Sequence, residues 1–286
     1  MQQKGIKLVE CPRDAMQGWE KFIPTDKKIE YLNALLKVGF DTLDFGSFVS
    51  PKAIPQMADT KLVISKLHIE EGSTKLLAIV ANVRGAEDAV LFDEITYLGF
   101  PFSVSETFQQ RNTSSGILES LNRVEAIQEI CNKNGKKLVV YISMGFGNPY
   151  GDEYSEEIVF QWMERLQEFN IEIFSIADTV GLATPQQVGS VAKHLVQSLP
   201  AKEIGVHLHS TPENWKAKLE AALDAGCNRF DGALKGIGGC PMAGNALVGN
   251  MDTGLMINYF QSKGLLQDLN MDALGEAKIL ADEIFI

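Results

Sequence analysis

The chain has 286 residues, of which 45% are hydrophobic and 22% are charged, and its formal net charge is -11 at pH 7. The composition is ordinary for a globular enzyme, and the acidic balance argues against a nucleic-acid partner. No apolar run is long enough to cross a bilayer, and the first residues lack a signal-peptide core. Four cysteines, Cys11, Cys131, Cys227 and Cys240, form no Cys-x-x-Cys pair. We expect a cytoplasmic protein without nucleic-acid or membrane partners.

Apolar segments alternate with helical patterns along the whole chain. The segments expected to form strands are residues 6–10, 41–46, 75–81, 94–102, 138–143, 172–177, 203–209 and 229–233. Thr25 and Ser155 are predicted helix N-caps, and Thr184 is predicted to form a capping box with Gln187. Thr211 is predicted to begin the helix that follows the seventh strand.

This alternation predicts the fold class. Strands that alternate strictly with helices run parallel, and eight such units favour an α/β protein built as a (β/α)8 TIM barrel. We expect a single catalytic domain over residues 1–286, with the barrel over about 6–250 and additional C-terminal helices over about 251–286. A doubly wound open sheet is the competing architecture. The first strand is not followed by Gly-x-Gly-x-x-Gly, which counts against dinucleotide binding.

The seventh predicted strand carries two histidines on one face. Side chains at i and i+2 of a strand point the same way, so His207 and His209 project together. Two neighbouring imidazoles are a ready pair of metal ligands. Two histidines satisfied by hydrogen bonds in the core are the alternative, and this stretch alone leaves both interpretations open.

Other polar residues follow the apolar strands at the end where a barrel carries its active site. They are Arg13 and Asp14 after the first strand, Asp44 at the end of the second, Glu106 after the fourth, and Asp178 with Thr179 after the sixth. Scattered surface charges are the alternative, but the repeated placement favours one shared rim. Asp14 can supply a hard oxygen ligand beside the histidines, and this mixed ligation suits Mg2+ or Mn2+.

A glycine-rich stretch after the eighth strand presents Cys240 on a loop. Its sequence is Gly236-Ile237-Gly238-Gly239-Cys240-Pro241. Glycines allow such a loop to approach a ligand closely, and a thiol there can donate a proton or act as a nucleophile. The alternative is an inert small apolar residue, which is the role expected for Cys131 and Cys227.

Several motifs together resemble the 3-hydroxy-3-methylglutaryl-CoA (HMG-CoA) lyase family, a metallolyase group of TIM barrels. They are Arg13-Asp14, Ser47-Phe48-Val49-Ser50-Pro51-Lys52, Pro55-Gln56-Met57, Ser105-Glu106-Thr107-Phe108, Asp178-Thr179-Val180-Gly181, the His207-x-His209 pair and Gly238-Gly239-Cys240-Pro241. The resemblance runs from about residue 6 to about residue 265. It implies metal ligation by Asp14, His207, His209 and an asparagine that follows a glycine. Asn250 and Asn245 both qualify, and Asn250 is preferred because the last helical segment follows it.

The resemblance also implies a reaction, the retro-Claisen cleavage of HMG-CoA to acetyl-CoA and acetoacetate, as in leucine degradation. It implies a divalent cation, Mg2+ or Mn2+, an acyl-CoA substrate and a homodimer. Arg13, Asp44 and Cys240 are the implied catalytic residues, with Arg13 stabilising the enolate and Cys240 protonating it. Arg13, Gln17 and Thr179 are implied to bind substrate. Alternatives are a related aldolase or acyl-CoA condensing enzyme, a lyase for another 3-hydroxyacyl-CoA, or a non-catalytic binding barrel.

Several positions depart from the family pattern, among them Asp14-Ala15-Met16-Gln17, where the family has Asp-Gly-Leu-Gln. Cys11 stands where the family has a glycine before Pro-Arg-Asp, and Asp44 stands where a glutamate is usual. Ser210 replaces an aspartate expected directly after the second histidine. Because a carboxylate beside a metal ligand normally holds that ligand in position, its absence at Ser210 predicts that the neighbouring ligand is held less firmly.

Overall fold

A computed structural model describes residues 5–70, 74–239, 248–266 and 268–286. Eight parallel strands form a closed barrel in which each strand pairs with the next and β8 pairs with β1. They are β1 (Lys7–Glu10), β2 (Thr42–Ser47), β3 (Lys75–Ile79), β4 (Ile95–Ser103), β5 (Lys137–Ser143), β6 (Ile173–Ala177), β7 (Glu203–His207) and β8 (Arg229–Gly232). The predicted TIM barrel is therefore confirmed, and the open sheet is excluded.

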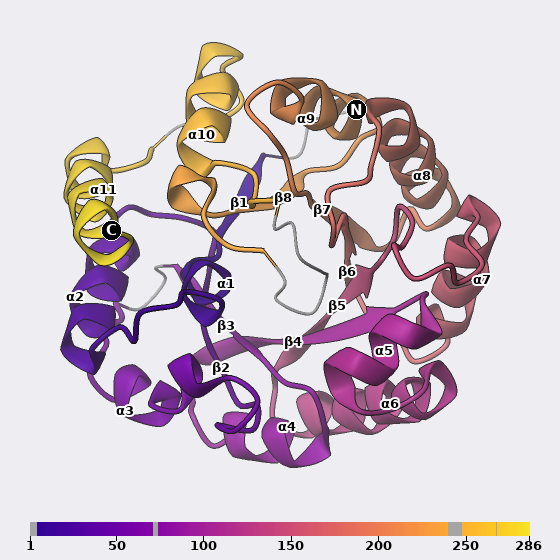
Figure 1. Ribbon diagram of the computed structural model, residues 1–286, viewed down its shortest axis with the longest axis horizontal. Coiled ribbons are helices and arrows are strands. Elements are labelled where there is room, and N and C mark those ends of the chain that lie inside the picture. The colour runs from indigo at the N-terminus through magenta and orange to yellow at the C-terminus, as the bar shows by residue number, and fades with distance from the viewer. Residues whose placement is uncertain (1–4, 71–73, 240–247, 267) are drawn as a thin grey trace.

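Most of the helices surround the barrel as an outer ring, whereas the short α1 lies inside this ring (Figure 1). The helices are α1 (Pro12–Gln17), α2 (Thr25–Leu36), α3 (Thr60–Ile64), α4 (Val83–Ala89), α5 (Glu106–Thr113), α6 (Ile117–Lys133), α7 (Glu156–Gln167), α8 (Pro185–Ser198), α9 (Trp215–Asp224), α10 (Thr253–Ser262) and α11 (Met271–Ile284), with short 3-10 turns at Pro55–Met57 and Leu234–Gly236. The last helix, α11, lies beside α2 (Figure 1), and Phe285 packs edge-on against Trp19 and Tyr31.

The strands are buried on both faces, as the apolar runs in the sequence predict. In β5, Val139 and Tyr141 belong to a cluster inside the barrel, while Leu138, Val140 and Ile142 belong to the larger core beneath the helices. Alternation along one strand therefore separates a small interior core from the layer that attaches the helices.

Two predicted helix starts are confirmed by their hydrogen bonds. The Ser155 hydroxyl accepts a hydrogen bond from the backbone N–H of Ile158, and Thr184 forms the capping box with Gln187. The prediction for Thr25 was wrong, because Thr25 is the first residue of α2 and its hydroxyl donates to Asp59 at 2.7 Å.

Two boundaries near the seventh strand also differ from the prediction. β7 ends at His207, so His209 lies beyond the strand. The following helix begins at Trp215 instead of Thr211, because the Asn214 side chain accepts a hydrogen bond from the Thr211 backbone N–H and holds residues 211–214 in a turn.

Two short helices were not predicted by periodicity. α1 follows β1 directly, starts with Pro12 and contains both Arg13 and Asp14. In α5, the first turn is held by the Ser105 hydroxyl, which accepts a hydrogen bond from the backbone N–H of Phe108. Both helices are six to eight residues long, too short for an apolar repeat to show in the sequence.

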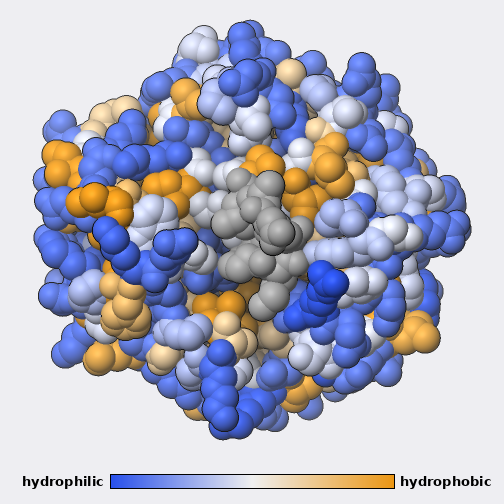
Figure 2. Space-filling model, in the orientation of Figure 1, coloured by the Kyte–Doolittle hydropathy of each residue, from blue (hydrophilic) through white to orange (hydrophobic). Residues whose placement is uncertain are grey.

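Hydrophilic residues predominate on the face shown in Figure 2, with hydrophobic ones in small groups among them. None of the helices in the described part of the chain is both long and apolar enough to cross a membrane.

Glu10 ties the barrel to the C-terminal helices. Its fully buried carboxylate accepts hydrogen bonds from the Leu234 backbone N–H at 2.9 Å and from the Thr253 hydroxyl at 2.5 Å. Burial raises the pKa of Glu10 from 4.5 to about 8, since desolvation outweighs these two hydrogen bonds.

We predict that Glu10→Gln becomes progressively more stable relative to the parent as the pH rises. Between pH 4.5 and about 8 the folded protein holds a proton on Glu10 that the unfolded chain has lost, so the parent loses stability over this window. The difference in unfolding free energy should grow by an amount on the order of 5 kcal/mol and then level off. Urea denaturation at several pH values measures it, with Glu276→Gln on the exposed side of α11 as the control. A pH-independent difference would contradict the prediction.

Candidate active site

Arg13 is the centre of a buried charged cluster at the end of β1. Its guanidinium donates to Asp44 through Nε at 3.0 Å and through Nη2 at 2.6 Å. Nη1 donates to Asp14 at 3.1 Å and to Gln17 at 2.8 Å. All of these except Gln17 are more than nine-tenths buried. A planar fork of N–H donors suits this arrangement, because it can serve two carboxylates at once.

The charges in this cluster shift its pKa values in opposite directions. Burial favours protonated Asp14, but the charges of Arg13, His207 and His209 outweigh burial and lower the pKa of Asp14 to about 2. Burial dominates at Asp44 and raises its pKa to about 6 despite the contact with Arg13. Asp14 therefore stays ionised at neutral pH, which is the form that binds a cation.

Asp14, His207 and His209 form a group with metal-ligand spacing. One ligand atom from each lies within 4.8 Å of the others, and all three residues are buried. Burial and the neighbouring His207 lower the pKa of His209, which keeps that ring neutral. At His207 burial is outweighed by Asp231, so the pKa is raised. The Nδ1 of His207 lies 3.3 Å from Asp231, which leaves Nε2 as the nitrogen available to an ion.

Asn250 joins this group through backbone pairing. It forms an antiparallel bridge with His209, and its Nδ2 donates to Asp14 at 2.7 Å. The Asn250 side-chain oxygen is buried and has no hydrogen-bond partner among the described residues. A buried oxygen without a partner is unfavourable unless something positive fills the space beside it. The donor set of carboxylate, amide oxygen and two imidazoles therefore fits a divalent cation.

Gly238 allows the loop after β8 to approach this group. Its φ is +111°, and a Cβ there would lie 2.4 Å from Asn250 Nδ2 and 3.0 Å from the Asp14 carbonyl oxygen. Any larger residue would push the amide away from Asp14, so glycine is required at this position.

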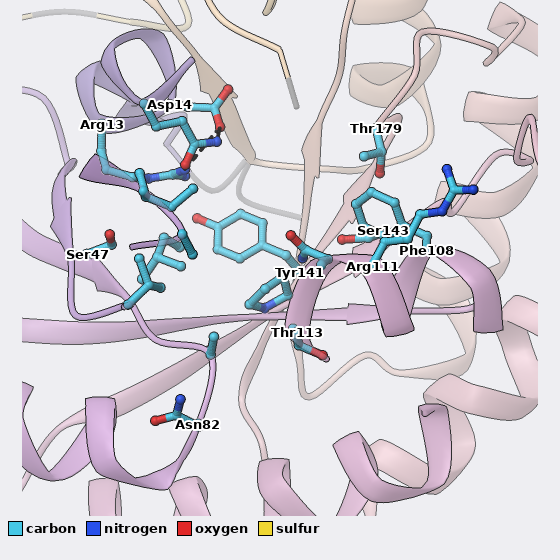
Figure 3. A pocket seen from close by; sticks show the side chains of 18 of the residues that line it. Arg13, Asp14, Ser47, Asn82, Phe108, Arg111, Thr113, Tyr141, Ser143 and Thr179 are labelled. Atoms are coloured by element: carbon cyan, nitrogen blue, oxygen red, sulfur yellow. Dashed lines mark hydrogen bonds and ion pairs between the residues drawn. The ribbon is translucent and has the colours of Figure 1, made fainter. Parts of the chain in front are cut away.

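A cavity of about 500 Å³ opens beside the cluster and is lined by Arg13, Asp14, Gln17, Thr179 and both histidines. Figure 3 shows Arg13 and Asp14 on one side of it and Thr179 on the other, with Tyr141 between them. Gln17 donates to Asp14 at 3.1 Å, and the Thr179 hydroxyl accepts from the Met144 backbone N–H at 2.8 Å.

Tyr141 lines the cavity and was not predicted from the sequence. Its hydroxyl is buried and without a hydrogen-bond partner in the described part of the chain. Its ring packs edge-on against His207 at 5.9 Å. The signal in the sequence was alternation, since Tyr141 shares the inward face of β5 with Val139.

Three residues predicted at the rim lie elsewhere. Asp178 forms a buried ion pair with Lys218 at 2.7 Å and accepts from the Ala183 backbone N–H. Glu106 accepts from the Ile117 backbone N–H at the start of α6, away from the cavity. Asp44 is in the middle of β2, not at its end, and lies behind Arg13. The carboxylates of Asp178 and Glu106 thus satisfy structural partners instead of a ligand.

Two predicted residues, Cys240 and Asn245, lie outside the described residues. The carboxylate missing at Ser210 has a counterpart, because Asp231 on β8 contacts the Nδ1 of His207. The Nδ1 of His209 lies 2.8 Å from the Val248 carbonyl oxygen. Both rings are therefore oriented by an acceptor on the side that faces away from Asp14.

The HMGL-like family model matches residues 6–280. The chain belongs to this family. The hydroxymethylglutaryl-CoA lyase of Bacillus subtilis is 33% identical over 266 residues, 93% of this chain and 88% of that protein. The cytoplasmic HMG-CoA lyase of Rattus norvegicus is 32% identical over 275 residues, 95% of this chain and 79% of that protein.

Solved structures of the family superpose closely. An HMG-CoA lyase from Acinetobacter baumannii, in complex with coenzyme A and 3-methylmalate, has a TM-score of 0.92 at 29% identity and covers 100% of this chain and 92% of its own. The Bacillus subtilis HMG-CoA lyase has a TM-score of 0.91 at 32% identity, over 98% of this chain and 93% of its own. Relatives include cytoplasmic and mitochondrial lyases, so similarity does not decide the compartment.

We predict that Asp44→Ala destabilises the protein by about 3 kcal/mol, because it removes the main partner of a buried guanidinium. Glu172→Ala is the matched control, since it removes the carboxylate of an exposed pair with Lys137 and should change stability by less than about 1 kcal/mol. Urea denaturation measures both variants. Equal decreases in unfolding free energy for Asp44→Ala and Glu172→Ala would contradict the prediction that the buried pair with Arg13 contributes more than the exposed pair.

Proposed function

We propose that the protein is a metal-dependent carbon–carbon lyase that cleaves HMG-CoA to acetyl-CoA and acetoacetate. The observation that carries the proposal is the buried group of Asp14, His207 and His209, completed by the unpartnered oxygen of Asn250, at the edge of a cavity. Family membership supports the choice of reaction, since relatives of similar length are named as HMG-CoA lyases.

Asp14, His207, His209 and Asn250 would hold the cation, with Mg2+ or Mn2+ favoured because two of the four donors are hard oxygens. A divalent ion bound there would supply Lewis acidity toward the tertiary hydroxyl of the substrate, so that a base can accept the hydroxyl proton as the carbon–carbon bond breaks. The pKa of about 2 at Asp14 keeps a full negative charge available to the ion.

The chain's own residues would then handle the developing charge. Arg13 lines the cavity and is fixed by Asp44, so its guanidinium can stabilise the enolate oxygen of the departing acetyl-CoA without reorganising. Asp44 acts through Arg13 as a positioning residue, since it lies behind the guanidinium. Gln17 and Thr179 would contact the acyl group, and Cys240 would protonate the enolate carbon.

The far side of the cavity suits an acyl-CoA. Arg111 and Arg123 are among its lining residues, and Figure 3 shows Arg111 across from Arg13 and Asp14. These guanidiniums offer local positive charge to phosphate groups in a chain that is acidic overall. The single-domain organisation, the homodimer and the cytoplasmic location stay predictions.

We predict that the purified protein with Mg2+ or Mn2+ releases acetoacetate from HMG-CoA, and that Cys240→Ala lowers turnover by at least about 100-fold because the proton donor is lost. Mn2+ binding by Cys240→Ala should be unchanged. Cys131→Ala, at a buried position in α6, is the matched control. No cleavage with either ion would refute the proposed function, and a panel of 3-hydroxyacyl-CoAs would then identify the substrate.

A second prediction concerns the cation site alone. Asn250→Ala should weaken Mn2+ binding by about 10–100-fold, since it removes an oxygen donor and the hydrogen bond that orients Asp14. Electron paramagnetic resonance of free Mn2+ measures the affinity without substrate. Asn134→Ala, at the C-terminal end of α6, is the control and should bind as the parent does. Unchanged affinity in Asn250→Ala would remove Asn250 from the ligand set.

A further inference from the structure

A second group of possible ligands lies on the other side of His207. Cys11, His207 and Asp231 each offer one ligand atom within 4.8 Å of the others, and all three are at least nine-tenths buried. They come from adjacent strands, because Asp231 on β8 is the direct partner of His207 on β7 and of Val9 on β1. Cys11 follows β1 immediately. The closed barrel therefore places these residues together through strand register.

The polar atoms of this group are poorly satisfied. The Oδ1 of Asp231 is buried without a hydrogen-bond partner among the described residues, although the residue is only 2% exposed. Its Oδ2 makes long contacts of 3.3 Å to His207 and 3.5 Å to Ser175. Among the described residues, the Cys11 thiol donates only to the Val9 carbonyl, at 3.9 Å. A buried carboxylate oxygen without a partner beside a thiol and an imidazole points to a cation.

We propose that Cys11, His207 and Asp231 form a second cation site, selective for a thiophilic divalent ion such as Zn2+. Thiolate, imidazole and carboxylate are the donors that zinc prefers, whereas the neighbouring group with Asp14 and Asn250 is richer in hard oxygen. When the ion binds, the thiol proton is released to solvent and the Nδ1 proton of His207 moves to Nε2, while thiolate and carboxylate together neutralise the two positive charges. Three protein donors leave one position of a tetrahedral site, which a water molecule would fill.

The geometry requires only a small adjustment. Bonds of about 2.0–2.3 Å in a tetrahedral site separate ligand atoms by roughly 3.5 Å, so atoms within 4.8 Å of one another need to close by about 1 Å. Neither Cys11 nor Asp231 is held by a short hydrogen bond that would oppose this movement.

Sharing one ring makes the two sites antagonistic. The Nδ1 of His207 faces Asp231, so a thiophilic ion takes that nitrogen and replaces its contact with the carboxylate. A second divalent charge behind the ring then lowers the affinity of the first site for Mg2+ or Mn2+. This consequence rests on the proposed function of the first site, whereas the existence of the second site does not. Zn2+ bound by Cys11, Asp231 and the Nδ1 of His207 would therefore inhibit the lyase reaction.

Cobalt(II) binding tests the site without any measurement of activity. Cys240→Ser serves as the parent, so that Cys240 cannot supply the sulfur. Titration of this metal-free protein with Co2+ should produce the near-ultraviolet sulfur-to-cobalt charge-transfer band. Adding Cys11→Ser should abolish the band and weaken Zn2+ binding, measured against a chromophoric chelator, by about 100-fold or more, since even a residue behind a ligand changes affinity by 10–100-fold. Cys227→Ser, a buried cysteine elsewhere, should retain the band.

Absence of the band in the parent, or its persistence in Cys11→Ser, would overturn the proposal. If Cys11→Ser fails to fold, Asp231→Asn takes its place and should raise the Co2+ concentration needed for the band at least tenfold, so an unchanged titration also overturns it. Mn2+ resonance in the same parent separates the two sites. Zn2+ should weaken Mn2+ binding more in this parent than in Cys11→Ser, where only direct competition for the first site remains. Equal weakening in the two proteins would contradict the shared ring, whereas a failed lyase assay with an intact cobalt band would refute only the proposed reaction.

Discussion

The buried guanidinium of Arg13 is the interaction on which the site depends. It binds Asp44 on one side and Asp14 on the other. A cation in a dry interior needs such partners, and two carboxylates so close together need the cation. The arrangement holds Asp14 in one orientation, beside both histidines, and keeps it ionised. The short helix α1 begins with Pro12, which suits the first position of a helix, and it carries Arg13 and Asp14 directly after β1.

Backbone hydrogen bonds place the remaining proposed metal ligands, His209 and Asn250, beside Asp14. His209 lies past the end of β7 and bridges to Asn250, while the Met251 backbone N–H donates to the Leu208 carbonyl at 3.0 Å. The segment before α10 thus runs against the end of β7 and delivers an amide to Asp14. Gly238 permits this approach, since a side chain there would collide with that amide. Ligands far apart in sequence are brought together by main-chain hydrogen bonds more than by side-chain contacts.

The fold was largely predictable from the sequence, and the proposed metal group partly so. Eight apolar segments separated by helical patterns left few architectures open, and β5, buried on both faces, was evident from its apolar run. The prediction that polar residues after strands share one rim held for Arg13, Asp14 and Thr179 but failed for Asp44, Asp178 and Glu106. Asp44 lies in the middle of β2 behind Arg13. Asp178 and Glu106 instead bind a buried lysine and a helix N-terminus, and such partners cannot be predicted before the helices are placed.

The sequence by itself determined the barrel, since strand and helix periodicities and capping residues are local properties of the chain. A period of two predicted that His207 and His209 share one face, but β7 ends at His207, and the bridge between His209 and Asn250 places the second ring. Only the tertiary structure decided that Asn250 pairs with His209, that Tyr141 reaches the cavity, and that Asp231 stands behind His207. Those contacts depend on barrel closure and strand register, which join residues about 24 to 240 positions apart, and no local pattern encodes such distances.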